Sequence, residues 1–134
     1  MGVEVHYEKI DTAFTYLNKE TGLFKVVNVP FVENLSEYVE MASKAAEEQQ
    51  EYFTGPLGND VFQCSPMPWV TYTHISHTNS GKKDNATPLF DWGKYYEKDG
   101  RILIPISIQA HHSFVDGIHI DQFVEKLQAF FDEC

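Results

Sequence analysis

The residues with the clearest capacity for chemistry lie near the carboxyl end, where His111 and His112 are followed, after three residues, by Asp116 and Gly117. The pair follows a segment patterned as a strand and precedes a segment patterned as an amphipathic helix. A histidine at such a corner can be held firmly while its ring faces an open cleft. An imidazole has an unperturbed pKa of about 6.5, so it can accept a proton near neutral pH. The pattern therefore predicts a general base.

The segment before the histidines is patterned as a half-buried strand. Isoleucine recurs there at every second position, at Ile102, Ile104, Ile106 and Ile108. Side chains two residues apart share one face of a strand, so this apolar face continues to Ala110 and His112. We therefore expect His112 to start on the buried side of the strand and His111 on the other side.

Other strands should position this corner. Residues 89–96 and 101–110 predict a hairpin closed by an Asp-Gly turn. Residues 12–17 and 23–29 predict a second hairpin, with Gly22 at the turn position that needs a positive φ. A further strand is expected at residues 69–73. The polar residues from 78 to 85 should form an exposed loop.

Two helices should cover the sheet. The first begins at Asn34, with Glu37 three residues later as in a capping box, and should end between residues 50 and 53. The second follows the Asp-Gly pair, and its apolar stripe should face the core. That stripe comprises Ile120, Phe123, Val124, Leu127, Phe130 and Phe131. Together the elements predict an α/β fold, a two-layer sandwich of a mixed β-sheet covered by helices.

Length and composition predict a single globular domain over residues 1–134. The chain is 43% hydrophobic and 14% aromatic, which is typical of a packed core. Its net charge of −10 argues against nucleic-acid binding, because there is no basic patch to neutralise phosphates. No run of 18 apolar residues occurs, so we expect no membrane span.

The remaining signals favour a cytoplasmic protein without a metal. The first six residues lack the features of a signal peptide. Cys64 and Cys134 are too few for a disulfide framework and fit a reducing compartment. His74 and His77 are three residues apart on a strand-to-loop segment, a spacing that does not bring two rings together, and no cysteine or carboxylate accompanies them at zinc-like spacing.

The HHxxxDG pattern and its flanks resemble the chloramphenicol acetyltransferases, a family of coenzyme-A-dependent acyltransferases. The matching segments are Pro68-Trp69-Val70, Gly93-Lys94-Tyr95-Tyr96, Ile104-Pro105-Ile106-Ser107-Ile108-Gln109 and Asp116-Gly117-Ile118-His119. The resemblance covers nearly the whole chain. Met1 falls well inside a family member, so we expect about the amino-terminal third of the family fold to be missing.

The resemblance implies roles for three residues near the reacting atoms. His112 matches the base that removes a proton from the acceptor hydroxyl. Ser65, four residues before Trp69, matches the serine whose hydroxyl stabilises the oxyanion. Asp116 matches a structural aspartate that pairs with an arginine and keeps the histidine loop in place. The chain's single arginine, Arg101, matches a different position, so the partner comes from elsewhere or Asp116 is only a helix N-cap.

The resemblance also implies two sets of binding residues. Trp69 and Tyr95 match positions that line the coenzyme A channel. The apolar acceptor pocket is matched by Phe24, Phe53 and Leu89. Asp91 stands where the family has a threonine close to the reacting oxygen. A carboxylate there would oppose a developing oxyanion unless it were protonated or turned away.

The implied function is transfer of the acetyl group of acetyl-CoA to a hydroxyl of chloramphenicol or a similar small acceptor, without an acyl-enzyme and without a metal. The resemblance implies a homotrimer with sites between subunits. The alternative is a truncated acyltransferase-like domain that assembles and binds but turns over poorly. A third interpretation is transfer from a carrier-bound acyl group, against which the Pro68-Trp69-Val70 segment counts.

Overall fold

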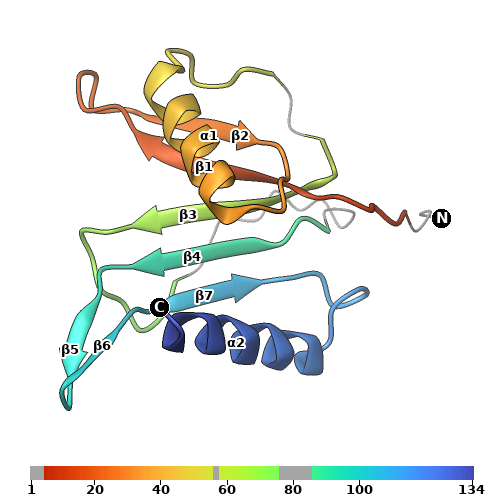
Figure 1. Ribbon diagram of the computed structural model, residues 1–134, viewed down its shortest axis with the longest axis vertical. Coiled ribbons are helices and arrows are strands. Elements are labelled where there is room, and N and C mark those ends of the chain that lie inside the picture. Colours follow the sequence, from red (N-terminus) through yellow and green to blue (C-terminus); the bar gives the residue numbers. More distant parts are fainter. Residues whose placement is uncertain (1–4, 56–57, 76–85) are drawn as a thin grey trace.

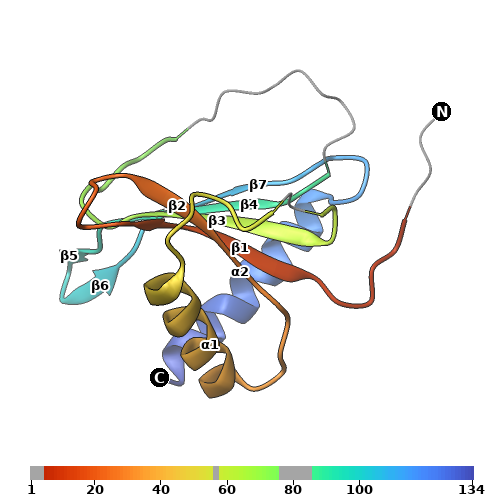
Figure 2. The same ribbon diagram turned by 90° about the horizontal axis from the view of Figure 1, so that it is seen from above.

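The computed structural model describes residues 5–55, 58–75 and 86–134. Its strands are β1 (Asp11–Leu17), β2 (Phe24–Val29), β3 (Val61–Met67), β4 (Leu89–Gly93), β5 (Tyr96–Lys98), β6 (Arg101–Leu103) and β7 (Ile106–Gln109). Within these residues a five-stranded sheet has the order β2-β1-β3-β4-β7, and β5 and β6 form a separate ribbon (Figure 1). The helices α1 (Leu35–Glu48) and α2 (Gly117–Asp132) lie on the same face of the sheet (Figure 2). The predicted α/β fold, a mixed sheet covered by helices, is confirmed.

The sheet is mixed because its central strands run parallel and its outer strands antiparallel. β1 pairs parallel with β3, and β3 with β4. β2 and β7 are added antiparallel at the two edges. The best-packed core lies between β2 and α1, where Val27, Val29 and Ala46 are buried. Phe14 on β1 packs against this cluster, so β1, β2 and α1 form one packed half of the sheet.

The elements predicted from local capping and turn residues are confirmed. Gly22 has a φ of 70° in the turn between β1 and β2. The side chain of Asn34 accepts a hydrogen bond from the backbone N–H of Glu37 at 3.1 Å, which caps α1. The helix ends at Glu48, earlier than predicted, because Gln49 turns to an extended conformation. The side-chain amide of Gln49 then donates to the carbonyl of Val26 on β2 at 2.8 Å, so tertiary contacts end the helix.

The strand predicted at residues 69–73 is wrong, and the strand lies earlier, in β3. Pairing of β3 with β1 stops at Cys64, so no strand faces that side of β3 at Pro66. Proline is tolerated there because it has no backbone N–H to donate. The segment after β3 is tied instead to the end of β4. The carbonyl of Val70 accepts from Lys94 N–H at 2.7 Å, and Thr71 Oγ1 donates to the Lys94 carbonyl at 2.7 Å.

The hairpin of residues 89–110 is confirmed, but each arm is broken into two strands. Asp99 and Gly100 have φ values of 53° and 74°, as the Asp-Gly turn predicted. Pro105 interrupts the second arm between β6 and β7, and its carbonyl accepts from the N–H of Gly93 at 3.1 Å. Since β5 and β6 leave the main sheet, Ile102 is 75% exposed. The expected continuous buried isoleucine face is therefore wrong.

Helix α2 covers the sheet less completely than its apolar stripe predicted. Phe123 contacts Phe90 of β4, with ring centroids 5.1 Å apart, so the stripe does face the sheet. None of the helix residues is buried, however, and Phe130 and Phe131 are about half exposed. The physical reason is position: β7 is an edge strand, so the sheet offers little surface beyond it. Neither helix in the described ranges has the length and hydropathy needed to cross a bilayer.

Candidate functional site

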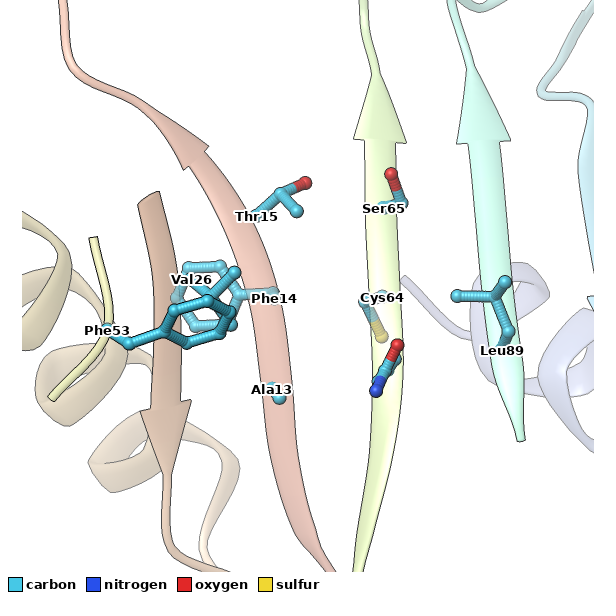
Figure 3. A pocket seen from close by; sticks show the side chains of 9 residues that line it. Ala13, Phe14, Thr15, Val26, Phe53, Cys64, Ser65 and Leu89 are labelled. Carbon is cyan, nitrogen blue, oxygen red and sulfur yellow. The ribbon is translucent and has the colours of Figure 1, made fainter. Parts of the chain in front are cut away.

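A cavity of about 280 Å³ lies where β1 and β3 separate. The two strands pair only as far as Phe14 and Cys64. Beyond that pair they diverge, and Thr15 and Ser65 stand on opposite sides of the opening (Figure 3). The lining residues are Ala13, Phe14, Thr15, Val26, Phe53, Gln63, Cys64, Ser65 and Leu89. The cavity is slightly smaller than the usual small-molecule site, and it has the mainly apolar walls of one.

Three residues expected from the sequence come together in this cavity. Ser65 contributes a half-buried hydroxyl from β3. Phe53, from the segment after α1, lies near Val26 and Phe14, while Leu89 at the start of β4 stands on the other side (Figure 3). A hydroxyl donor beside apolar walls can hydrogen-bond one polar atom of a ligand while the walls exclude water. This arrangement suits a small, largely apolar molecule with a reacting oxygen.

Phe24, the third residue expected in the acceptor pocket, is not part of this lining. It packs edge-to-face against Trp69, with ring centroids 5.8 Å apart. Both rings are about half exposed. Phe24 therefore lies with one of the residues expected to bind coenzyme A and not with Phe53 and Leu89.

Trp69 and Tyr95 lie on two segments that the backbone ties together. The link is the hydrogen bond from Lys94 N–H to the Val70 carbonyl. Gly93 is essential to this contact, because a Cβ at this position would lie 2.5 Å from the Val70 oxygen. The sequence did not single out Gly93 for this role. A glycine inside a predicted strand was the available signal, since it often marks a close backbone approach.

His112 lies on an exposed corner, contrary to the expectation that it starts on the buried side of the strand. Its side chain is 93% exposed. β7 ends at Gln109, and the carbonyl of His111 then accepts from the N–H groups of Phe114 and Val115, both at 3.0 Å. The chain therefore turns before the alternation of strand faces can reach His112.

Asp116 occupies the N-cap position of α2, as the local interpretation predicted, but the N–H of His119 is accepted by its backbone carbonyl at 3.0 Å. Its Oδ1 lies 3.8 Å from His112 Nδ1, and both side chains are largely exposed. The chain's arginine, Arg101, lies on β6. Figure 1 shows β6 on the side of the carboxyl end of α2, whereas Asp116 is at the amino end of that helix. Arg101 is therefore not the partner of Asp116 within this chain.

Ser65 and His112 lie toward opposite ends of the sheet. Ser65 is near the carboxyl end of β3, and His112 follows the carboxyl end of β7, which runs the other way. Ser65 is in register with Asp91, and Asp91 with Ser107. Ordinary strand spacings then put Gln109 about 12 Å from Ser65, with His112 farther beyond the strand end. One chain does not bring the predicted base and oxyanion donor together.

Asp91 is 1% exposed and does not line the cavity, although it is the register partner of Ser65. Burial, and then the charge of Asp91, raises the pKa of the Cys64 thiol to about 11. The same two causes raise the pKa of Tyr72, whose hydroxyl donates to the Asp91 carbonyl at 2.9 Å. Cys64 lines the cavity, but a thiol with so high a pKa stays protonated and is not a nucleophile near neutral pH.

The described residues contain no cluster of three histidine, cysteine or acidic side chains that could hold a metal ion. His77, one of the two histidines considered for such a site, lies outside the described residues. So does the loop expected at residues 78–85.

Comparison with known proteins links this geometry to a family. A family described as "Chloramphenicol acetyltransferase" matches residues 2–128. A chloramphenicol acetyltransferase of Bacillus pumilus is 30% identical over 133 residues, which are 96% of this chain and 60% of the relative. Chloramphenicol acetyltransferase 2 of Haemophilus influenzae is 28% identical over 132 residues, with 96% and 62% covered. The chain thus spans about three fifths of the length of these relatives.

Solved structures agree on the fold. A chloramphenicol acetyltransferase structure superposes with a TM-score of 0.80 at 25% identity, covering 92% of this chain and 62% of the other. The cubic core of a pyruvate dehydrogenase multienzyme complex superposes with a TM-score of 0.60 at 17% identity, covering 90% and 53%. The second likeness concerns the fold alone.

Proposed function

Because the chain belongs to the chloramphenicol acetyltransferase family, we propose that it transfers the acetyl group of acetyl-CoA to a hydroxyl of chloramphenicol or a similar small acceptor. The observation that carries the proposal is the cavity between β1 and β3, where the hydroxyl of Ser65 meets apolar walls that include Phe53 and Leu89. The cavity suits an aromatic acceptor whose reacting oxygen lies at the serine.

In the proposed reaction His112 is the general base and Ser65 the oxyanion donor. The imidazole takes the proton of the acceptor hydroxyl as that oxygen attacks the thioester carbonyl. Ser65 donates a hydrogen bond to the oxygen that becomes negative, an interaction worth about 3–4 kcal/mol in comparable enzymes. When the intermediate collapses, the carbon–sulfur bond breaks and the imidazolium returns its proton to the thiolate of coenzyme A. The ester and the free thiol leave together, without an acyl-enzyme and without a metal.

The separation of the two residues supports a site that is shared between chains. His112 of one chain would meet the Ser65 cavity of a neighbour, and a closed ring of three chains repeats this contact three times. The corner that carries His112 also exposes Phe114 and Ile118, which are 50% and 58% exposed and suit burial against a neighbour. A ring of three is the assembly that the family resemblance implies, and we therefore propose a homotrimer.

Trp69 and Tyr95 are proposed to bind coenzyme A, since their exposed rings lie on segments joined at Gly93. Their aromatic bodies suit the pantetheine arm and their polar tips the solvent side. The proposal also entails a cytoplasmic protein, because acetyl-CoA is a cytoplasmic metabolite.

The alternative, a domain that assembles and binds but turns over poorly, is favoured by one observation: Asp116 has no arginine near it in the described part of this chain. A single assay separates the two. Release of free coenzyme A thiol from acetyl-CoA is followed with chloramphenicol present and absent. Thiol release that depends on the acceptor supports the enzyme function. It should be lost in His112→Ala and kept in a remote surface variant such as Gln122→Ala. Binding of both substrates without thiol release supports the alternative.

A further inference from the structure

Three histidines surround the corner at the start of α2, and the proposed reaction uses only one of them. His112 is the base, while His111 and His119 have no assigned role. Both of these rings accept hydrogen bonds from backbone N–H groups of the corner itself.

His119 occupies the third position of α2, where its ring turns back to the start of the helix. Its Nδ1 accepts from the backbone N–H of Asp116 at 2.9 Å. In return, the backbone N–H of His119 donates to the Asp116 carbonyl at 3.0 Å. In a capping box the N–H of the N-cap residue is likewise accepted by the side chain at the third helical position, which is usually glutamate or glutamine. An imidazole can replace them only if Nδ1 carries no proton, so the arrangement selects the tautomer that is protonated at Nε2.

His111 supplies the remaining acceptors. Its Nδ1 accepts from Ser113 N–H at 3.2 Å, and its carbonyl accepts from the N–H groups of Phe114 and Val115. The four consecutive backbone N–H groups from Ser113 to Asp116 are thus all accepted by His111 or His119. None of residues 111–119 is buried, so these hydrogen bonds are what fixes the shape of the corner.

We propose that His119, assisted by His111, is a positioning residue: its neutral imidazole closes the corner that aims the His112 ring at the neighbouring site. The role rests on the proposed acetyltransferase function and extends it. The side chain of His112 is 93% exposed, and its ion-pair contact with Asp116 is long, at 3.8 Å, so its direction depends on the backbone beneath it. A small displacement of a catalytic group has a large effect on rate.

The kinetic test compares two substitutions at position 119 in the assembled protein. His119→Leu removes the acceptor, while His119→Gln keeps an acceptor at a position where glutamine serves in capping boxes. Leucine should lower kcat about five- to tenfold, as a small displacement of the His112 ring would, with both KM values nearly unchanged. Glutamine should restore most of the loss. Gln122→Ala, a change on the exposed surface of the same helix, should leave kcat at the wild-type level.

A second readout does not depend on turnover. Imidazole ¹⁵N shifts of the wild type should show His119 with an unprotonated Nδ1, and amide exchange at Asp116 should be about tenfold faster in His119→Leu than in His119→Gln. Equal exchange in the two variants, or a leucine variant that loses protection but keeps wild-type kcat, overturns the proposal. If the wild type itself transfers no acetyl group, the proposed function fails. The positioning role is then judged by the backbone order parameter of His112, and an unchanged value in His119→Leu overturns it.

Discussion

Two inactive variants should form active oligomers when they are mixed, because His112 and Ser65 of one chain lie toward opposite ends of the sheet. His112→Ala removes the proposed base, and general base catalysis is worth about 10²–10⁴-fold. Ser65→Ala removes the proposed oxyanion donor, for which the expected loss is about 10²–10³-fold in kcat. Ordinary strand spacings put the two residues more than about 12 Å apart in one chain. A site that needs both must therefore draw them from two chains.

The expected size of the recovery follows from random assembly. In an equal mixture, half of the chains keep His112 and half keep Ser65, so about a quarter of the shared sites combine both intact residues. The variants are mixed, dissociated under mild denaturant, reassembled, and assayed for acceptor-dependent thiol release. Each variant reassembled alone is the control. Recovery near a quarter of the wild-type activity is the expected result. A mixture no more active than its components would refute the shared site, provided that ultracentrifugation shows mixed oligomers.

Three further predictions test single residues. Gly93→Ala should lower the free energy of unfolding by about 1–3 kcal/mol, since its methyl group would meet the Val70 oxygen at 2.5 Å. Gly117→Ala, where a Cβ meets nothing within 4 Å, should melt like the wild type, and equal melting of both variants would contradict the close approach. A thiol reagent should modify the exposed Cys134 at neutral pH, but Cys64 only as the pH nears its raised pKa of about 11. In Cys134→Ser, where Cys64 is the remaining thiol, fast labelling at pH 7 would contradict that shift. Asp91→Thr should raise kcat for chloramphenicol by about tenfold with the KM for acetyl-CoA unchanged, if relief of charge repulsion near Ser65 is worth about 1.4 kcal/mol. Unchanged acceptor kinetics would mean that the Asp91 carboxylate does not act on the site.

Sequence patterns predicted the structure where a few adjacent residues decide it. Gly22 adopts the positive φ that its turn needs, and the Asn34 side chain caps α1. The Asp-Gly turn at residues 99–100 forms for the same reason. In each case the interaction is confined to about four residues, so no distant contact can override it.

Prediction failed at two places, one decided by a partner distant in the sequence and one by where a strand ends. Residues 69–73 have the composition of a strand, yet their backbone is tied to Lys94 and the true strand includes Pro66. The alternation of isoleucines predicted that His112 lies on a buried face. The backbone turns before that residue, because the His111 carbonyl accepts hydrogen bonds from Phe114 and Val115. Strand propensity does not reveal the contact with Lys94, because that contact depends on which segments become neighbours. The turn at His111 is local, and it was missed because the strand alternation was extended past the end of β7 at Gln109.

The cavity itself is a consequence of strand order that no local pattern contains. On one side, β1 stays paired with β2 up to the Leu17–Phe24 pair and is held by the core around Val27. On the other side, β3 stays paired with β4 up to the Met67–Gly93 pair. The two halves are joined by the short pairing of residues 11–14 on β1 with residues 61–64 on β3. Each half is stabilised by its own outer strand and helix, so the sheet can open at this seam without unravelling. Substitutions that loosen either half should therefore alter the cavity before they unfold the chain.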